Sequence, residues 1–188
     1  LMAGGLGKRL SPLTDKIPKP LLSVGNKPIL ETIIQGFTRY NFTQFFISVN
    51  YKSDLIKAYF QDGHKWGIDI EYLEESQPSG TAGSLSILDA GKIKKPFFVM
   101  NGDLLTNINF EEMLNYHTRS KAEMTVAVRT YEFEVPFGVI ESRDGYVQSI
   151  KEKPRNSFFV NAGVYLLNTD LLEFIPKGQF YDMPDLIH

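Results

Sequence analysis

The stretch that decides the fold is Met2–Leu22, MAGGLGKRLSPLTDKIPKPLL. Three glycines (Gly4, Gly5 and Gly7) share this loop with four cationic residues and only one acidic residue. Glycine lets backbone N–H groups approach a ligand closely, and N–H groups at such a loop bind anions. A loop of this kind normally follows a buried strand, of which the last two residues, Leu1 and Met2, remain. The stretch therefore predicts an α/β fold with a site for a small polyanion.

Neither of the two common phosphate-binding motifs fits this loop. The dinucleotide fingerprint G-x-G-x-x-G needs a glycine where Leu10 stands. The Walker loop G-x-x-x-x-G-K-[ST] needs a glycine at Met2 and a hydroxyl residue at Arg9. The loop therefore indicates phosphate binding of another class, with a solvated turn as the alternative.

Two cations of the loop are the first candidates for phosphate chemistry. Arg9 can bind phosphate oxygens with two N–H groups at once. Lys19 lies between Pro18 and Pro20, which stiffen its backbone. Residues 1–27 hold five cationic side chains and one acidic one, although the whole chain has a net charge of −2. This local excess of positive charge suits a polyanionic ligand.

Apolar residues recur at the spacings of alternating strands and helices, which predicts a doubly wound, mainly parallel, Rossmann-like α/β sheet. Ser53 and Asn109 are predicted helix caps. From residue 138 to 167 strands prevail, which predicts an additional antiparallel region. Strands are expected at 45–49, 68–73, 96–100 and 124–128, with 96–100 fit for a central parallel strand, and helices are expected to begin near residues 28, 53, 80 and 109.

Composition excludes several functional classes. The chain has 188 residues and no cysteine, so it has neither disulfides nor thiolate metal sites, and we expect a cytoplasmic protein. Its slight acidity argues against nucleic-acid binding. No apolar run is long enough to cross a membrane. His64 and His117 stand among polar residues, and we expect both at the surface.

Two further segments should lie with the glycine loop at the carboxyl ends of the strands, where open α/β sheets bind ligands. Asp103 directly follows a buried strand and a glycine, so it is placed to hold Mg2+, with a helix cap as the alternative reading. The turn at residues 79–83, SGTAG, has small residues against which a flat base can lie; alone, it is equally a helix start.

In this order, the segments GGLGKRLSPLT, PKPLL, GTAG, NGD, EKP and NAGVY resemble the sugar-1-phosphate nucleotidylyltransferases, over nearly the whole chain. The family joins a nucleoside triphosphate to a sugar 1-phosphate with Mg2+ and releases pyrophosphate. The turn at residues 74–83 is similar to the guanylyl branch, which includes mannose-1-phosphate guanylyltransferases and domains of bacterial surface-glycan pathways. The resemblance therefore implies GTP as the donor.

The resemblance also implies roles for individual residues. The implied catalytic residues are Arg9, Lys19 and Asp103, with Asp103 as the Mg2+ ligand. The residues implied to bind the nucleotide are Ala3, Gly4, Gly5, Gly7, Arg9, Gln77, Gly80 and Thr81. The residues implied to bind the sugar phosphate, in the antiparallel region, are Gly138, Glu152, Lys153 and Asn161.

Residues 1–188 are expected to form a single nucleotidyltransferase domain, truncated at both ends. The missing parts would be the first strand and the segment with a second metal-binding aspartate. The expected partners are a nucleoside triphosphate and a sugar 1-phosphate, without nucleic acid or membrane; a homo-oligomer and a regulatory domain outside the chain stay open. The alternatives are a catalytically silent regulatory homologue, the same reaction with another triphosphate and, more distantly, a dehydrogenase.

Overall fold

The computed structural model describes residues 1–7, 10–93 and 95–188. They divide into two compact units. The first comprises Leu1–Thr125 and Val164–His188, and the second comprises Val126–Gly163. The expectation of a single domain truncated at both ends stays a prediction.

The first unit is organised around a parallel sheet. Strand β3 (Gln44–Val49) pairs in parallel with β4 (Asp69–Glu74). On the other side of β3, Met2 forms parallel bridges both to Ser48 and to Asn101, the residue after β5 (Phe97–Met100). The first three residues are therefore a central strand between β3 and β5, as the glycine loop predicted.

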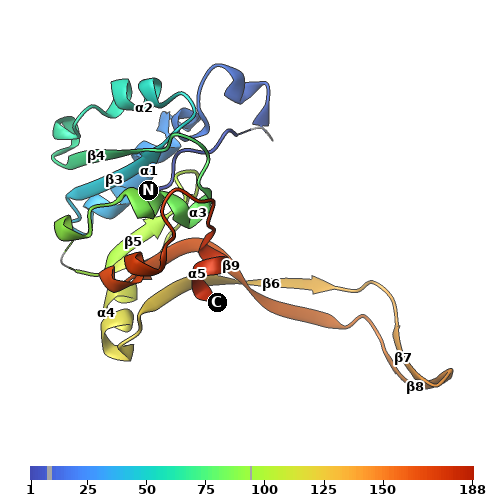
Figure 1. Ribbon diagram of the computed structural model, residues 1–188. Coiled ribbons are helices and arrows are strands. Elements are labelled where there is room, and N and C mark those ends of the chain that lie inside the picture. The colour runs from blue at the N-terminus through green and yellow to red at the C-terminus, as the bar shows by residue number, and fades with distance from the viewer. Residues whose placement is uncertain (8–9, 94) are drawn as a thin grey trace. The chain divides into compact units, whose positions relative to one another are not determined.

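The remaining strand pairs of the first unit are antiparallel. The last four residues of β9 (Arg155–Leu167) pair with β5, from Phe97↔Leu167 to Met100↔Val164. A small hairpin joins β1 (Ser23–Val24) to β2 (Lys27–Pro28). The helices of this unit are α1 (Ile29–Thr38), α2 (Ser53–Phe60), α3 (Gly80–Gly83), α4 (Phe110–Ser120) and α5 (Met183–Ile187) (Figure 1).

An aromatic cluster ties the helices to the sheet. The ring of Phe37, on α1, stacks on that of Phe110, on α4, at a centroid distance of 3.9 Å. It also makes edge contacts with Phe42, Phe45 and Phe98. Such pairs contribute beyond the apolar area they bury. The cluster therefore fixes α1 and α4 against the strands whose far ends carry the candidate site.

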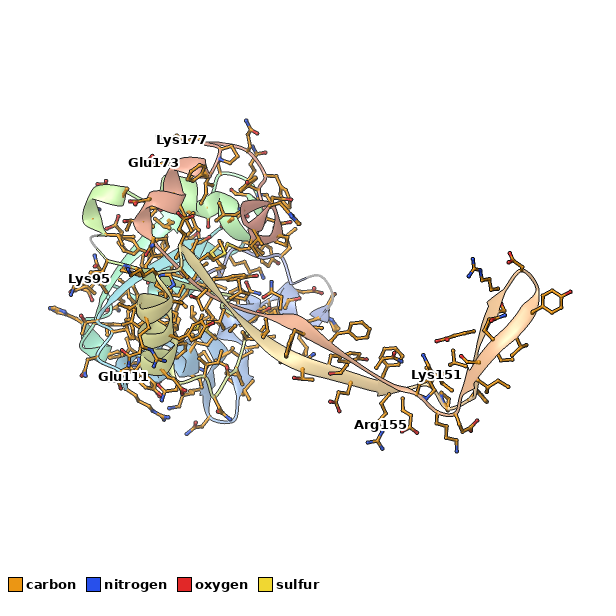
Figure 2. All side chains as sticks on the ribbon, turned by 90° about the horizontal axis from the view of Figure 1, so that it is seen from below. Lys95, Glu111, Lys151, Arg155, Glu173 and Lys177 are labelled. Atoms are coloured by element: carbon orange, nitrogen blue, oxygen red, sulfur yellow. The ribbon has the colours of Figure 1, made fainter. Side chains whose placement is uncertain are left out.

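The second unit consists of strands. β6 (Met124–Glu134) and β9 enter it side by side as a ribbon, and β7 (Val139–Arg143) pairs with β8 (Tyr146–Lys151) as an antiparallel hairpin (Figure 1). Two cations of this unit, Lys151 and Arg155, are labelled in Figure 2. They form ion pairs between neighbouring strands: Arg155 Nε lies 2.9 Å from Glu134 Oε2, and Lys151 Nζ lies 2.5 Å from Glu141 Oε1. The prediction of a Rossmann-like α/β fold with an added antiparallel region is confirmed.

The predicted helix starts are confirmed in part. Asn109 does cap α4, and its side chain accepts a hydrogen bond from Glu112 N (3.0 Å). Ser53 is not a cap, because the helix begins at Ser53 itself after Lys52 in a left-handed conformation. The helix at Gly80 is a single turn that continues as a 3-10 helix, Ser84–Ile87. No helix in the described part of the chain has the length and apolar character needed to cross a membrane.

The expected surface position of His117 is wrong, whereas His64 is exposed as predicted. The His117 side chain is 2% exposed, and it bonds through Nδ1 to Thr125 Oγ1 (2.7 Å) and through Nε2 to Asn168 Oδ1 (3.1 Å). Because the Asn168 oxygen can only accept, Nε2 must donate. Thr125 is eight residues away on the next strand and Asn168 is 51 residues away, so the polar neighbours of His117 in sequence gave no sign of its burial.

We expect His117→Ala to lower the free energy of unfolding by roughly 2 kcal/mol or more, because the substitution empties a buried site and leaves the partly buried amide oxygen of Asn168 without its donor. Urea unfolding measures the change. The matched control is His64→Ala, which should stay within about 0.5 kcal/mol of the parent chain. Equal effects of the two substitutions would contradict the buried hydrogen-bond network.

Candidate active site

A cavity of about 500 Å³ lies at the carboxyl ends of the parallel strands of the first unit. Its wall comes from segments far apart in sequence, because the sheet brings their strand ends together. Open α/β sheets bind their ligands at this edge. The segments lining the cavity are residues 2–7, 78–81 and 101–103, together with Leu10, Lys19, Pro20, Ser48, Glu75, Phe180 and Asp182.

Two glycines of the loop lie close to neighbouring side chains, and at Gly7 the backbone conformation itself favours glycine. Gly7 has a φ of +62°, and a Cβ there would lie 2.9 Å from Thr14 Cγ2. Buried Thr14 fixes this turn by donating from Oγ1 to the Gly7 carbonyl (3.0 Å). A Cβ on Gly4 would lie 2.6 Å from Glu75 Oε1. The loop therefore lies close to Thr14 and Glu75, and a side chain at Gly7 or Gly4 would push these neighbours away.

Lys19 and Asp103 form an ion pair in this cavity, with Lys19 Nζ donating to Asp103 Oδ2. Both side chains are about one-third exposed, so a ligand can reach them. Lys19 is the first residue of a short 3-10 helix, Lys19–Leu21. The prolines on either side of it, Pro18 and Pro20, are both buried. The expected stiff backbone around this cation is therefore present.

Asp103 owes its place to Gly102. The Gly102 amide donates to the Met2 carbonyl (2.8 Å), and a Cβ at Gly102 would lie 2.8 Å from that same oxygen. This close contact fixes the backbone just before Asp103 against the strand at residues 1–3.

The site suits a divalent cation that also binds the ligand. Within the described ranges, no three His, Cys, Asp or Glu side chains gather in a metal-binding group. Mg2+ commonly uses only one or two carboxylates and completes its shell with phosphate oxygens and water. The carboxylate of Asp103, partly exposed in the cavity wall, fits that requirement.

The turn at Gly80 is locked to the C-terminal segment. Asp182 Oδ1 accepts from the Thr81 amide (2.7 Å) and from the Thr81 hydroxyl (2.9 Å), and that hydroxyl accepts from Met183 N (2.8 Å). Gly80 has a φ of +82°, and a Cβ there would lie 2.5 Å from the Tyr181 carbonyl oxygen. The Thr81 hydroxyl is thus engaged within the protein, although Thr81 still lines the cavity.

The structure brings most of the predicted nucleotide residues together. The predicted residues that line the cavity are Ala3, Gly4, Gly5, Gly7, Lys19, Gly80, Thr81 and Asp103. Gln77 is exposed and outside the lining; its carbonyl accepts from Ser79 Oγ (3.0 Å). Arg9 lies outside the described residues. The roles assigned to all these residues remain predictions.

Sequence reasoning missed two carboxylates of the lining, Glu75 and Asp182. Glu75 follows β4 as Asp103 follows β5. Its position after a strand could therefore have indicated that it lies at the same edge of the sheet. Asp182 and Asp185 form a capping box at the start of α5, and the spacing of two acidic residues around Met183-Pro184 could have shown it.

The predicted sugar-phosphate residues all belong to the second unit. Within it, a Cβ on Gly138 would lie 3.0 Å from Glu152 Oε2, so these two residues are neighbours. Lys153 has a left-handed backbone (φ 43°), and Asn161 Oδ1 accepts from Gly163 N (2.8 Å). Their roles towards a sugar remain predictions.

Known proteins resemble this chain over almost its whole length. A family model described as nucleotidyl transferase matches residues 1–185. The mannose-1-phosphate guanyltransferase of Gibberella zeae is 33% identical over 183 residues, which cover 93% of this chain and 50% of that protein. Mannose-1-phosphate guanyltransferase beta-A of Xenopus laevis is 34% identical over 182 residues, covering 93% of this chain and 51% of that protein. The chain thus spans about half the length of these curated relatives.

A solved structure has the same fold. HddC from Yersinia pseudotuberculosis superposes with a TM-score of 0.72 at 24% identity, covering 95% of this chain and 80% of that chain.

We expect Gly80→Ala to destabilise the chain by about 3 kcal/mol or more, because the new Cβ collides with backbone in addition to straining a left-handed residue. The control is Gly25→Ala, since Gly25 has a φ of +72° with open space around it. That substitution should cost only about 1–2 kcal/mol. Urea unfolding compares the two variants, and equal costs would contradict a close contact between the turn and Tyr181.

Proposed function

The chain belongs to the nucleotidyl transferase family, and from that premise we propose that it transfers a guanylyl group from GTP to a sugar 1-phosphate. The products are a GDP-sugar and pyrophosphate. The observation that carries the proposal is the Lys19–Asp103 pair beside the glycine loop in one cavity. Relatives named mannose-1-phosphate guanyltransferase, at about one-third identity, support guanine as the base and mannose 1-phosphate as the first acceptor to test.

The proposed reaction is an in-line displacement at phosphorus. A phosphate oxygen of the sugar 1-phosphate attacks the α-phosphorus of GTP and forms a new P–O bond. The bond from the α-phosphorus to the bridging oxygen of the β-phosphate breaks, and pyrophosphate leaves with that electron pair. The attacking oxygen is already anionic, so no side-chain base is needed. The protein has to position groups and neutralise charge.

The residues of the cavity divide these tasks. The backbone of the glycine loop from Ala3 to Gly7 binds the nucleotide and approaches its phosphates closely. Lys19, held by two buried prolines, faces the reacting phosphates with a fixed positive charge. Arg9, which belongs to the same stretch of sequence and lies outside the described residues, is assigned to stabilise the departing pyrophosphate.

A divalent metal is typical of the family, and we propose Mg2+ with Asp103 as its protein ligand. When bound, the ion supplies further neutralisation of phosphate charge. The hydrogen bond from Lys19 holds the Asp103 carboxylate in position for this role.

The sugar phosphate is assigned to the second unit. Gly138, Glu152 and Asn161 contact sugar hydroxyls, and Lys153 contacts the sugar phosphate. The adjacency of Gly138 and Glu152 supports a shared role for these two residues.

The direct test is pyrophosphate release by the full-length protein with Mg2+, crossing GTP, ATP, UTP and dTTP against a panel of sugar 1-phosphates. The proposal expects release with GTP and one sugar phosphate. Release only with another triphosphate would overturn the base assignment. Tight nucleotide binding without release for any pair would instead favour a regulatory homologue.

Lys19→Ala should lower kcat by on the order of a hundredfold, because it removes a fixed charge from the reacting phosphates. Steady-state pyrophosphate release by the full-length protein measures this effect. The control is Lys16→Ala, which removes a cation of the same loop that is exposed and outside the cavity lining. A Lys19→Ala enzyme as active as the Lys16→Ala enzyme would remove Lys19 from the mechanism.

Asp103→Asn should raise the Mg2+ concentration needed for half-maximal activity by roughly tenfold or more, since even outer-shell partners of a metal commonly contribute that much. A Mg2+ titration of activity at saturating GTP provides the measurement. Asp69→Asn, at the opposite end of β4, serves as the control because Asp69 is exposed and outside the cavity. An unchanged titration in Asp103→Asn would exclude this residue as the ligand.

A further inference from the structure

Asp182 is a carboxylate in the cavity wall that the proposed reaction leaves without a role. It belongs to the C-terminal segment at residues 179–183, and its side chain contacts Thr81, which is 101 residues away in sequence. The residue is partly buried, and within the described ranges no lysine, arginine or histidine forms an ion pair with it. Its carboxylate is therefore stabilised by hydrogen-bond donors of the protein rather than by a cation.

The turn that Asp182 contacts is too short to hold its own shape. Helix α3 comprises a single turn, and residues 76–78 before it are exposed. A helix of this length has little stability of its own, because its first turn fixes several backbone dihedrals for one hydrogen bond. The conformation of the Gly80 turn must therefore be set by neighbouring segments.

The C-terminal segment supplies backbone contacts to this turn. Tyr181 N donates to Ser79 O (2.9 Å), and Tyr181 O accepts from Ala82 N (3.0 Å) and from Gly83 N (2.9 Å). The first N–H groups of a helix have no partner within the helix. These bonds therefore satisfy donors that the turn itself leaves free.

Asp182 adds the side-chain contacts. Its Oδ1 accepts from the Thr81 amide (2.7 Å) and from the Thr81 hydroxyl (2.9 Å), while that hydroxyl accepts from Met183 N (2.8 Å). The hydroxyl is thus engaged both as a donor and as an acceptor, which fixes its orientation. Because hydrogen bonds to a carboxylate are stronger than those between neutral groups, Asp182 is the strongest single link between the turn and the C-terminal segment.

The position of Asp182 is itself fixed by the protein. Asp182 N donates to Asp185 Oδ2 (3.0 Å) in the capping box at the start of α5. The next residue, Met183, is fully buried. Asp182 therefore holds the Gly80 turn from a rigid point, and without this side chain the turn would lose its main support at the cavity.

We propose that Asp182 is a positioning residue of the nucleotide site, which holds the Gly80 turn in the conformation that forms the cavity wall. This inference rests on the proposed function and adds a residue that supports nucleotide binding through Thr81, without a contact of its own to the ligand. If the turn is held in only a fraction of the molecules, the apparent Kd of the nucleotide rises by the inverse of that fraction.

The test measures the Kd of GTP by isothermal titration of the full-length protein and its variants, each shown to be folded by circular dichroism. Asp182→Ala should raise the Kd roughly tenfold or more, because the loss of a hydrogen bond to a charged acceptor commonly shifts a conformational equilibrium by that factor. Asp182→Asn should recover most of the parent affinity, since its amide oxygen can accept both bonds from Thr81.

Asp185→Ala is the matched control. It removes the other carboxylate of the capping box and leaves both bonds between Asp182 and Thr81 in place. A merely structural role for Asp182 would make both alanine variants less stable to urea and leave the Kd of GTP at the parent value in both. The proposal expects a raised Kd in Asp182→Ala alone.

Thr81→Val is the variant to use if Asp182→Ala does not fold, because it removes one bond to Asp182 and keeps the capping box; it should raise the Kd severalfold. An unchanged Kd in the folded variant, or an equal rise in Asp185→Ala, would overturn the inference and leave the proposed transfer reaction intact. A parent protein that binds GTP but releases no pyrophosphate would overturn the transfer reaction alone. A parent protein that binds no GTP would overturn both.

Discussion

The site depends on one constraint, the seating of the first three residues as a strand between β3 and β5. Met2 N donates to the Met100 carbonyl (2.9 Å), and Ala3 N donates to the Ser48 carbonyl (2.9 Å), so this short segment is bonded on both sides. Its end releases the glycine loop at the carboxyl edge, between the ends of the neighbouring strands. Gly102 permits the close approach, because a side chain there would meet the Met2 carbonyl. Every other feature of the cavity is placed relative to this strand.

The cavity that results has an ordered distribution of charge. On the β5 side, Lys19 and Asp103 offer a fixed cation and a metal-ligand carboxylate. On the β4 side, Glu75 offers acceptors held by a serine hydroxyl and an amide. The positive charge of Lys19 suits the phosphates of the proposed nucleotide.

The sequence predicted the features that local physics controls. Glycine and proline spacing identified the loop and its stiff lysine, and apolar periodicity located the strands that carry Asp103 and the Gly80 turn. Residues whose surroundings come from distant segments were misjudged or missed. His117 is buried, and its hydrogen-bond partners are Thr125 and Asn168. Glu75 lines the cavity only because the sheet sets β4 beside β3. Ser53 failed as a cap because the left-handed Lys52 already turns the chain into α2.

The central claim is that the nucleotide binds in this cavity with its phosphates at Lys19 and Asp103. A crystal structure of the full-length protein with GTP and Mg2+, without sugar phosphate, tests it most directly. The account predicts the α-phosphate beside Lys19, the metal on Asp103, and the nucleotide backed by the glycine loop. A nucleotide whose phosphates lie away from Lys19 and Asp103, or one bound outside this cavity, would contradict it.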